Sequence, residues 1–413
     1  MNWPLAGDGE WAPGRPLTLG LFISDTSSGW TGGMVYLGNM VKCLAALPPE
    51  ERPKVAMFYS GKIALEKFSD LTSLQNVHPV PYPFPAGRIP SRFGPAIAHL
   101  SRRILDALGI RTRAAGVGEI DVSFGFAEFP WVSAVHIHWI PDFQHRRLPR
   151  FFTPEDIAQR DKNHAQVAGR DGVLLLSSQA AYQDFTEFYP AAKVTPKVWS
   201  FVSDYTAAEL AGPDPRGKYQ LPPKYIYLPN QFWAHKDHMT AFRAVKTLMD
   251  GGLAVDLVCT GLMNDYRAPG HMQTLLDYIE ENGLSARIKI LGLVPRQDQV
   301  RIFRHACAIL QPSLFEGWST TIEDSKALGK TLILSDLPVH LEQVKGYPFP
   351  NTFFETGNAD ELADTLGRLW PTMAPGPDGQ SEQKAREYTA KRKIEAGRLF
   401  LSHAREAMRL AGR

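Results

Sequence analysis

Short apolar runs alternate with stretches of helical spacing along this chain, and the alternation begins again in the second half. We interpret the apolar runs as buried strands, at residues 17–24, 55–59, 121–125, 133–139 and 172–178 in the first half and 224–228, 253–259, 287–291, 308–310 and 331–335 in the second. Strands that alternate with helices of about 10–15 residues form parallel sheets with right-handed crossovers. The sequence therefore predicts an α/β protein with two doubly wound sheets.

A stretch rich in proline and glycine, residues 204–223, separates the two halves. Such stretches mark loops and boundaries, and 413 residues are too many for one ordinary core. We predict an N-terminal domain over residues 1–205, a C-terminal domain over 206–382 and a charged amphipathic helix within 383–413.

Composition limits the classes of function. The 45 Lys and Arg nearly balance the 43 Asp and Glu, which gives no sign of a nucleic-acid-binding protein. Three scattered cysteines, with no CxxC motif and no Cys/His cluster, indicate buried thiols and no metal site; they are Cys43, Cys259 and Cys307. We find no signal peptide at residues 1–16 and no run of the ~18 apolar residues that a membrane span needs. We expect a cytoplasmic protein, at most peripheral to a membrane.

Two segments of the first half stand out by their glycine and arginine content. The first predicted strand leads into a loop, Asp25–Gly33, which contains Gly32 and Gly33 and precedes a predicted helix at 34–47. Strand, glycine loop and helix open many doubly wound sheets. Residues 79–118 are irregular and basic, with Arg88, Arg92, Arg102, Arg103, Arg111 and Arg113. An arginine-rich run is most often a solvated face, and the alternative is a surface for an acceptor or an anionic membrane.

The most informative stretch is residues 311–329, which follows a predicted strand, passes Gly317 and opens a helix ending at Gly329. The free N–H groups of a helix N-terminus bind phosphate, and here they would come from Ser319, Thr320 and Thr321. Glu316 and Glu323 would border the same crevice at the carboxyl edge of the sheet, where such folds bind ligands. Taken alone, Thr320–Glu323 is also a capping box, in which Glu323 serves the helix only.

Residues 312–342 resemble the donor-site signature of glycosyltransferase family 4, whose members are retaining enzymes of the GT-B fold. The resemblance implies that Glu316 lies near the transferred sugar, that Glu323 holds the ribose hydroxyls, and that Gly317 and the residues after it form the diphosphate site. The family has seven residues between its two glutamates, whereas six separate Glu316 from Glu323. We interpret this difference as a shortened loop.

A second segment, Leu228–His238, resembles the family's basic turn after the first strand of the C-terminal domain. The family places an arginine there and a lysine five residues later, both facing the diphosphate. Lys236 matches the lysine, and Gln231 stands in the arginine's place, where it can donate a hydrogen bond but supplies no charge. His235 or an arginine of the N-terminal domain could compensate. Outside the family, Lys236 would be read as an ordinary exposed lysine.

Three further segments resemble parts of the family's cleft. Gly32 and Gly33 match a glycine loop that approaches the donor, and the Gly292–Pro295 loop, with Val294, matches the cradle of the nucleoside base. The Trp139–His145 turn resembles a segment that faces the cleft. We therefore nominate Asp142 and His145 as sugar or acceptor contacts, and His138, which with His136 alternates with apolar residues on a strand, as cleft lining or a core histidine.

The resemblance implies two Rossmann-like domains facing a central cleft, with the C-terminal helix returning to the N-terminal domain. It implies transfer of a sugar from a nucleotide-diphosphate sugar to a hydroxyl of a glycan or lipid-linked acceptor, suited to surface polysaccharide synthesis. Lys236, Glu316 and Asp142 are the candidate catalytic residues; neither a metal nor a cofactor is expected, and membrane contact would involve Arg88–Arg113. Asp142 acting as a general base would instead give inversion. The alternatives are a catalytically weak sugar-nucleotide-binding subunit and a UDP-sugar 2-epimerase.

Overall fold

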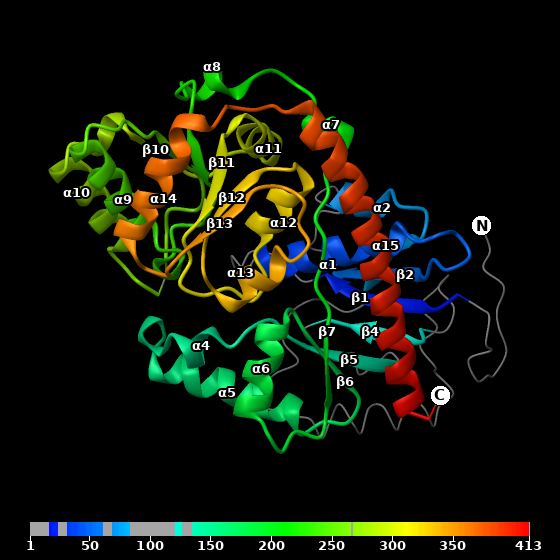
Figure 1. Ribbon diagram of the computed structural model, residues 1–413. Helices are drawn as coiled ribbons and strands as arrows, with labels where there is room; N and C mark the ends of the chain where they lie inside the picture. The colour runs from blue at the N-terminus through cyan, green and yellow to red at the C-terminus, as the bar shows by residue number, and fades with distance from the viewer. Residues whose placement is uncertain are drawn as a thin grey trace.

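The computed structural model describes residues 16–23, 31–60, 68–82, 120–125, 134–265 and 267–412. They form two α/β units, each built on a parallel sheet, with one long helix near the C-terminus reaching from the first unit to the second (Figure 1). The arginine-rich segment proposed as a membrane contact, Arg88–Arg113, lies outside the described residues.

The first sheet has seven strands in the order β3-β2-β1-β4-β5-β6-β7, all paired in parallel. The strands are β1 (Thr18–Ile23), β2 (Lys54–Ser60), β3 (Val77–Tyr82), β4 (Val122–Phe124), β5 (Val135–Ile140), β6 (Val173–Leu176) and β7 (Thr195–Val198). The five strands predicted for this half are confirmed. The sequence did not predict β3 and β7, which form the two edges of the sheet.

The second sheet has six parallel strands in the order β10-β9-β8-β11-β12-β13. They are β8 (Ile226–Leu228), β9 (Leu257–Cys259), β10 (Ile288–Ile290), β11 (Ala308–Gln311), β12 (Thr331–Ser335) and β13 (Asn351–Phe354). All five predicted strands are present, and β13 at the edge is an addition. The chain order reverses between β8 and β11, so a crevice is expected beyond the carboxyl ends of these two strands.

Helices cover both sheets (Figure 1). They are α1 (Thr31–Ala45), α2 (Ser69–Thr72), α4 (Gln144–Arg147), α5 (Pro154–Ala168), α6 (Gln179–Phe188), α7 (Ala207–Leu210), α8 (Pro215–Tyr219), α9 (His238–Asp250), α10 (His271–Glu281), α11 (Arg296–His305), α12 (Thr320–Ala327), α13 (Pro338–Gln343), α14 (Ala359–Leu369) and α15 (Gly379–Leu410), with short 3₁₀ turns η3 (Pro149–Phe151), η4 (Ala234–Lys236), η5 (Leu284–Ala286) and η6 (Trp370–Thr372). The helices predicted at residues 34–47, before Gly329 and within 383–413 are present as α1, α12 and α15.

Helix α15 packs against α1 and belongs to the core of the first unit (Figure 1). Phe400 and Ala404 are fully buried in that core, and the indole N–H of Trp199 donates to the Ala396 carbonyl at 2.8 Å. The two helices approach closely at Gly397, where a Cβ atom would lie 2.7 Å from the Cys43 carbonyl oxygen. The last long helix of the chain is therefore part of the first unit's interior.

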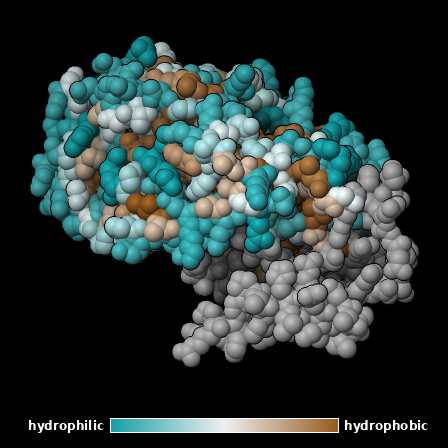
Figure 2. Space-filling view, turned by 90° about the horizontal axis from the view of Figure 1, so that it is seen from below, coloured by the Kyte–Doolittle hydropathy of each residue, from teal (hydrophilic) through white to brown (hydrophobic). Residues whose placement is uncertain are grey.

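On the face seen in Figure 2, the coloured residues are mostly hydrophilic, with small apolar patches between them. Within the described ranges, we find no helix with the length and apolar character needed to cross a membrane.

Candidate functional site

Two loops at the switch point of the second sheet place a lysine and a glutamate against each other. Lys236 ends η4 after β8, and Glu316 lies in the loop between β11 and α12. The Lys236 Nζ is 2.6 Å from the Glu316 Oε1, and both side chains are largely buried, at 16% and 8% exposure. Two residues that the sequence singled out, 80 positions apart, thus meet at the edge where this fold binds ligands.

The Glu316 carboxylate is held by further donors. The Gln311 side-chain amide donates to Glu316 Oε1 at 2.7 Å and to the Ser319 hydroxyl at 3.0 Å, and the Ser313 hydroxyl donates to the same Glu316 oxygen at 2.8 Å. Gln311 is itself fixed, because Asn230 donates to its side-chain oxygen at 2.6 Å. The sequence did not identify Gln311 and Asn230 as site residues, although both lie inside the quoted motifs.

Helix α12 begins beside this ion pair, with Ser319 as its N-cap. The Ser319 N–H donates to Gln343 Oε1 at 3.2 Å, so this amide is engaged within the protein. The Thr321 hydroxyl donates to Pro229 O and Asn230 Oδ1. The N–H groups of Thr320 and Thr321 donate to no described residue, which leaves two amides, rather than the predicted three, for an anion.

The structure corrects the expectation for Glu323. Its side chain is completely buried, and its carboxylate accepts hydrogen bonds from Arg392, Lys326 and Gln343 at 2.7–3.2 Å. Burial alone would raise the pKa of Glu323, but the charges of Arg392 and Lys326 hold it below its usual value. Because both carboxylate oxygens are occupied inside the protein, Glu323 does not face the crevice. The capping box does not form either, because the N-cap is Ser319.

The neighbouring carboxylate, Asp324, restores the spacing that the sequence analysis found one residue short. Seven residues separate Glu316 from Asp324, so no loop has to be shortened. Asp324 Oδ2 accepts from the Arg296 guanidinium at 2.7 Å, and Asp324 Oδ1 is buried with no hydrogen-bond partner among the described residues. Counting seven residues from Glu316 would have identified Asp324.

The turn after β8 contains Gln231, which is half-buried, and a nearby arginine that the sequence analysis missed. Arg267 lies 3.2 Å from the His235 ring and donates to Gln144 of the first unit at 3.0 Å. Its guanidinium lies between the rings of Trp233 and Phe152, at 4.9 and 5.2 Å from their centroids.

Burial, followed by the charges of Lys236 and Arg267, lowers the pKa of His235 well below its usual value. The sequence suggested that His235 or an arginine of the N-terminal domain could compensate for Gln231. The arginine that lies beside His235 is Arg267, which belongs to the second unit.

The first unit contacts the site directly at Gly317. A Cβ atom on Gly317 would lie 2.6 Å from the Pro141 carbonyl oxygen and 3.0 Å from the Asp142 Cβ. The next residue, Trp318, donates its indole N–H to the Phe201 carbonyl at 3.1 Å. Asp142, a candidate from the sequence, thus lies against the Glu316 loop, with its Oδ1 accepting from the Gln144 N–H at 3.0 Å.

Two histidine candidates lie inside the first unit. His145 has no exposed surface, and its Nε2 is 2.9 Å from Asp161 Oδ1. The expected contact of His145 with sugar or acceptor is contradicted, because its side chain is fully buried inside the first unit. His138 is 7% exposed on β5, with its ring 5.0 Å from that of His136.

The two remaining features predicted from the sequence, the glycine pair Gly32–Gly33 and the base loop with Val294, lie in different units. Gly32 and Gly33 lie in the first turn of α1, which begins at Thr31, rather than in a loop before it. Residues 24–30, which include the rest of the predicted glycine loop, lie outside the described residues. Val294 is half-buried in the loop after β10, where Gly292 has a φ of +66° and its carbonyl accepts from the Gly261 N–H at 2.9 Å.

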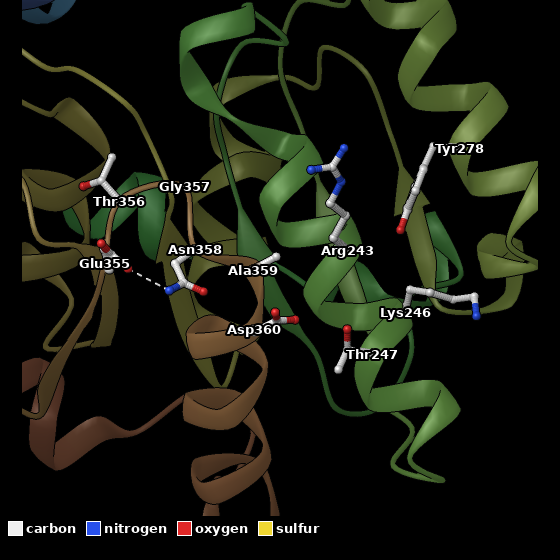
Figure 3. Close-up of a pocket in the computed structure, with 10 residues that line it drawn as sticks. All are labelled: Arg243, Lys246, Thr247, Tyr278, Glu355, Thr356, Gly357, Asn358, Ala359 and Asp360. Atoms are coloured by element: carbon white, nitrogen blue, oxygen red, sulfur yellow. Dashed lines mark hydrogen bonds between the residues drawn. The ribbon is translucent and has the colours of Figure 1, made fainter.

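A separate pocket of about 620 Å³ lies between α9 and the start of α14 (Figure 3). It contains none of the residues predicted for the site, and its lining consists of Arg243, Lys246, Thr247, Tyr278, Glu355, Thr356, Gly357, Asn358, Ala359 and Asp360. In Figure 3, Arg243 and Lys246 from α9 lie on one side of the pocket, and Glu355 and Asp360 from the α14 segment lie on the other. Within the described part of the chain, no three or more His, Cys, Asp or Glu side chains gather as a metal site.

Comparisons with known proteins give one family match and several similar folds. Residues 215–373 match the family model described as "Glycosyl transferases group 1", and no curated protein sequence matches the chain. A glycosyltransferase from Rickettsia africae ESF-5 superposes with a TM-score of 0.62 at 15% identity, covering 95% of this chain and 99% of that one. Anabaena Alr3699/HepE in complex with UDP and glucose gives 0.61 at 12% identity, covering 94% and 98%.

A third solved structure, described as trehalose-6-phosphate from E. coli bound with UDP-2-fluoro glucose, gives a TM-score of 0.59 at 13% identity and covers 94% of this chain and 98% of that one. The likeness in all three cases extends over both α/β units. The chain therefore has the GT-B fold, and its second α/β unit matches the glycosyl transferases group 1 family.

Proposed function

We propose that this protein is a retaining glycosyltransferase of the family 4 type, which transfers a sugar from a nucleotide-diphosphate sugar to a hydroxyl acceptor. The observation that carries the proposal is the Lys236–Glu316 ion pair beside the two free amides at the start of α12. The family match of the second unit supports it, as do similar structures described with UDP or a UDP-sugar.

Lys236 and the Thr320 and Thr321 amides bind the donor diphosphate. Negative charge grows on the diphosphate as the glycosidic bond breaks, so cationic and N–H groups aimed at it stabilise the transition state more than the ground state. When the donor enters, the Lys236 ammonium exchanges part of its contact with Glu316 for phosphate oxygens. Glu316 then accepts hydroxyl hydrogen bonds from the transferred sugar. These protein groups neutralise the leaving diphosphate, and we propose that the reaction needs no metal.

Asp324 takes the role of holding the ribose, which the sequence analysis gave to Glu323. Its Oδ1 is a buried acceptor with no partner among the described residues, and a buried acceptor left without a donor costs about 1–3 kcal/mol. A ribose hydroxyl supplies that donor once the Arg296 side chain, which is 44% exposed, swings aside. The loop that contains Val294 precedes Arg296 and receives the nucleoside base.

The acceptor enters from the first unit, where Asp142 lies against Gly317. In the retaining reaction its hydroxyl attacks the anomeric carbon on the face that the diphosphate leaves. The new glycosidic bond forms as the bond to the diphosphate oxygen breaks, and that oxygen takes the hydroxyl proton. Asp142 orients the acceptor. We propose a glycan or lipid-linked hydroxyl acceptor and a role in surface polysaccharide synthesis at the cytoplasmic side of a membrane.

The first test is the shift in melting temperature with a panel of UDP-, GDP-, dTDP- and ADP-sugars, because a ligand that binds only the folded state stabilises it. We expect one nucleotide class to raise Tm. The anomeric configuration of the product, read by NMR, then distinguishes retention from inversion. Binding without turnover or donor hydrolysis would favour a partner subunit, and a new sugar formed without acceptor would favour an epimerase.

A further inference from the structure

One buried ion pair joins the donor helix α12 to the long helix α15. The Arg392 guanidinium donates to both oxygens of Glu323, from Nη1 to Oε2 at 2.8 Å and from Nη2 to Oε1 at 3.2 Å. Glu323 has no exposed surface, and the Arg392 side chain is 19% exposed. Paired contacts of this kind fix direction as well as distance, because the guanidinium is planar.

Arg392 belongs to a helix that is anchored in the other unit. Four residues further along α15, Ala396 accepts the Trp199 indole hydrogen bond, and Phe400 lies in the core of the first unit. Residues four apart share one face of a helix. The face of α15 that packs into the first unit therefore also presents Arg392 to the second.

A short path of hydrogen bonds leads from Glu323 to the start of α12. The Gln343 side-chain amide donates to Glu323 Oε1 at 3.2 Å and to the Ser319 carbonyl at 2.8 Å, while Gln343 Oε1 accepts from the Ser319 N–H. Ser319 is the N-cap that precedes the two free amides, and Asp324 follows Glu323 directly. The hydrogen bonds among Glu323, Gln343 and Ser319 therefore lie beside the two free amides and beside the Asp324 carboxylate, which we assign to donor binding.

We propose that Arg392 is a positioning residue for donor binding, which holds the start of α12 through Glu323 and Gln343 and ties that position to the first unit. The inference rests on the proposed function, because the groups it positions are those assigned to the donor. Arg392 does not touch the donor. Without its charge, Glu323 keeps only Lys326 as a buried cation, and the first turn of α12 loses its link to α15.

The first experiment compares Arg392→Met with Arg392→Lys and with a control on the same helix. Arg398→Met is the control, since Arg398 also joins α15 to the first unit, through Glu51 at 2.7–2.8 Å, but at the surface. We expect Arg392→Met to raise the donor KM and the nucleotide Kd about tenfold or more, with kcat changed by less than about threefold. Arg392→Lys should recover most of the affinity, and Arg398→Met should match the wild type.

The second experiment needs no donor. Hydrogen exchange of the amides in residues 319–324, measured well below the lowest Tm, should be about tenfold faster or more in Arg392→Met than in Arg398→Met. If Arg392→Met does not fold, the double variant Glu323→Gln/Arg392→Met removes the Glu323 and Arg392 charges together, while Lys326 keeps its hydrogen bond to the Gln343 carbonyl at 2.6 Å. It should still show the faster exchange.

Two results separate this inference from the proposed function. If the wild type binds no nucleotide of the panel, the proposed function fails, and the exchange data still decide whether Arg392 holds α12. If Arg392→Met, or the double variant in its place, lowers Tm but leaves α12 exchange and nucleotide affinity equal to those of Arg398→Met, Arg392 is structural only and the inference is overturned.

Discussion

Lys236 supplies a positive charge in the turn after β8. Gln231, five residues earlier in the same turn, supplies none. Lys236→Ala should lower kcat about 100-fold or more, on the scale of a lost oxyanion contact. Lys236→Arg keeps the charge and is the matched variant, with an intermediate rate expected because the guanidinium differs in shape. Steady-state rates with the donor found by the panel check this, and a near-normal rate for Lys236→Ala would remove Lys236 from the site.

Asp324 and Glu323 are adjacent residues with different predicted consequences. Asp324→Ala should raise the donor KM about tenfold, because it removes a hydrogen bond made to ligand. It should lower Tm less than Glu323→Ala does, because the Arg296 side chain that loses its ion pair is 44% exposed. Glu323→Ala should lower Tm strongly, since it leaves two buried cations without their carboxylate and breaking such a pair costs about 3–5 kcal/mol. Kinetics and thermal unfolding of both variants check the pair. Equal KM values for Asp324→Ala and the wild type would contradict the ribose assignment.

At the scale of elements, the sequence predicted every strand in the middle of a sheet and missed three of the four edge strands, β3, β7 and β13; β10 is the edge strand that it predicted. Strands β3 and β7 contain Pro79, Pro81 and Pro196, and proline is tolerated at an edge because it has no N–H to donate to a neighbour. These prolines interrupt the apolar runs of β3 and β7, so the sequence pattern of a strand is weak at both edges. Helix α5 was missed because Ala168 is its only buried residue, so it lacks an apolar stripe.

The site was predicted in part. Sequence motifs identified Lys236 and Glu316, because each residue lies in a motif that begins at the end of a predicted strand. They did not distinguish Glu323, whose carboxylate is bonded inside the protein, from Asp324, whose Oδ1 has no partner among the described residues, since that depends on the phase of α12 and on its N-cap. Arg392 lies 69 residues from Glu323, and the pairing follows only from how α15 packs.

At the scale of the whole molecule, the two units touch at Gly317 with no room for a side chain. Gly317→Ala places a Cβ 2.6 Å from the Pro141 carbonyl, so the loops must separate. We expect kcat to fall about tenfold, because acceptor and donor groups sit on opposite sides of this contact. Gly217→Ala is the control, as a Cβ there meets nothing within 4 Å. Steady-state kinetics and the radius of gyration check this; a Gly317→Ala kcat equal to that of Gly217→Ala would contradict it.

Four histidines that are half-buried or fully buried make stability depend on pH, two in each unit. Burial, the largest cause, lowers the pKa values to about 3 for His136, His164 and His238 and to about 4 for His340. Between about pH 4 and the ordinary value near 6.5, the unfolded chain binds more protons than the folded one. The contribution of these histidines to stability is therefore complete above pH 6.5 and is lost as the pH is lowered. Tm should drop steeply between pH 6.5 and 4.5 and less so in His238→Asn; a flat profile would contradict this.

The position of α15 affects how the protein is made. Trp199 and α1 are synthesised early, but Phe400 and Ala404, which complete their apolar surroundings, emerge about 200 residues later. At translation rates of roughly 5–20 residues per second, this delay is about 10–40 seconds. During that interval the first unit has an open apolar groove on the ribosome, so the second unit can finish folding before the first.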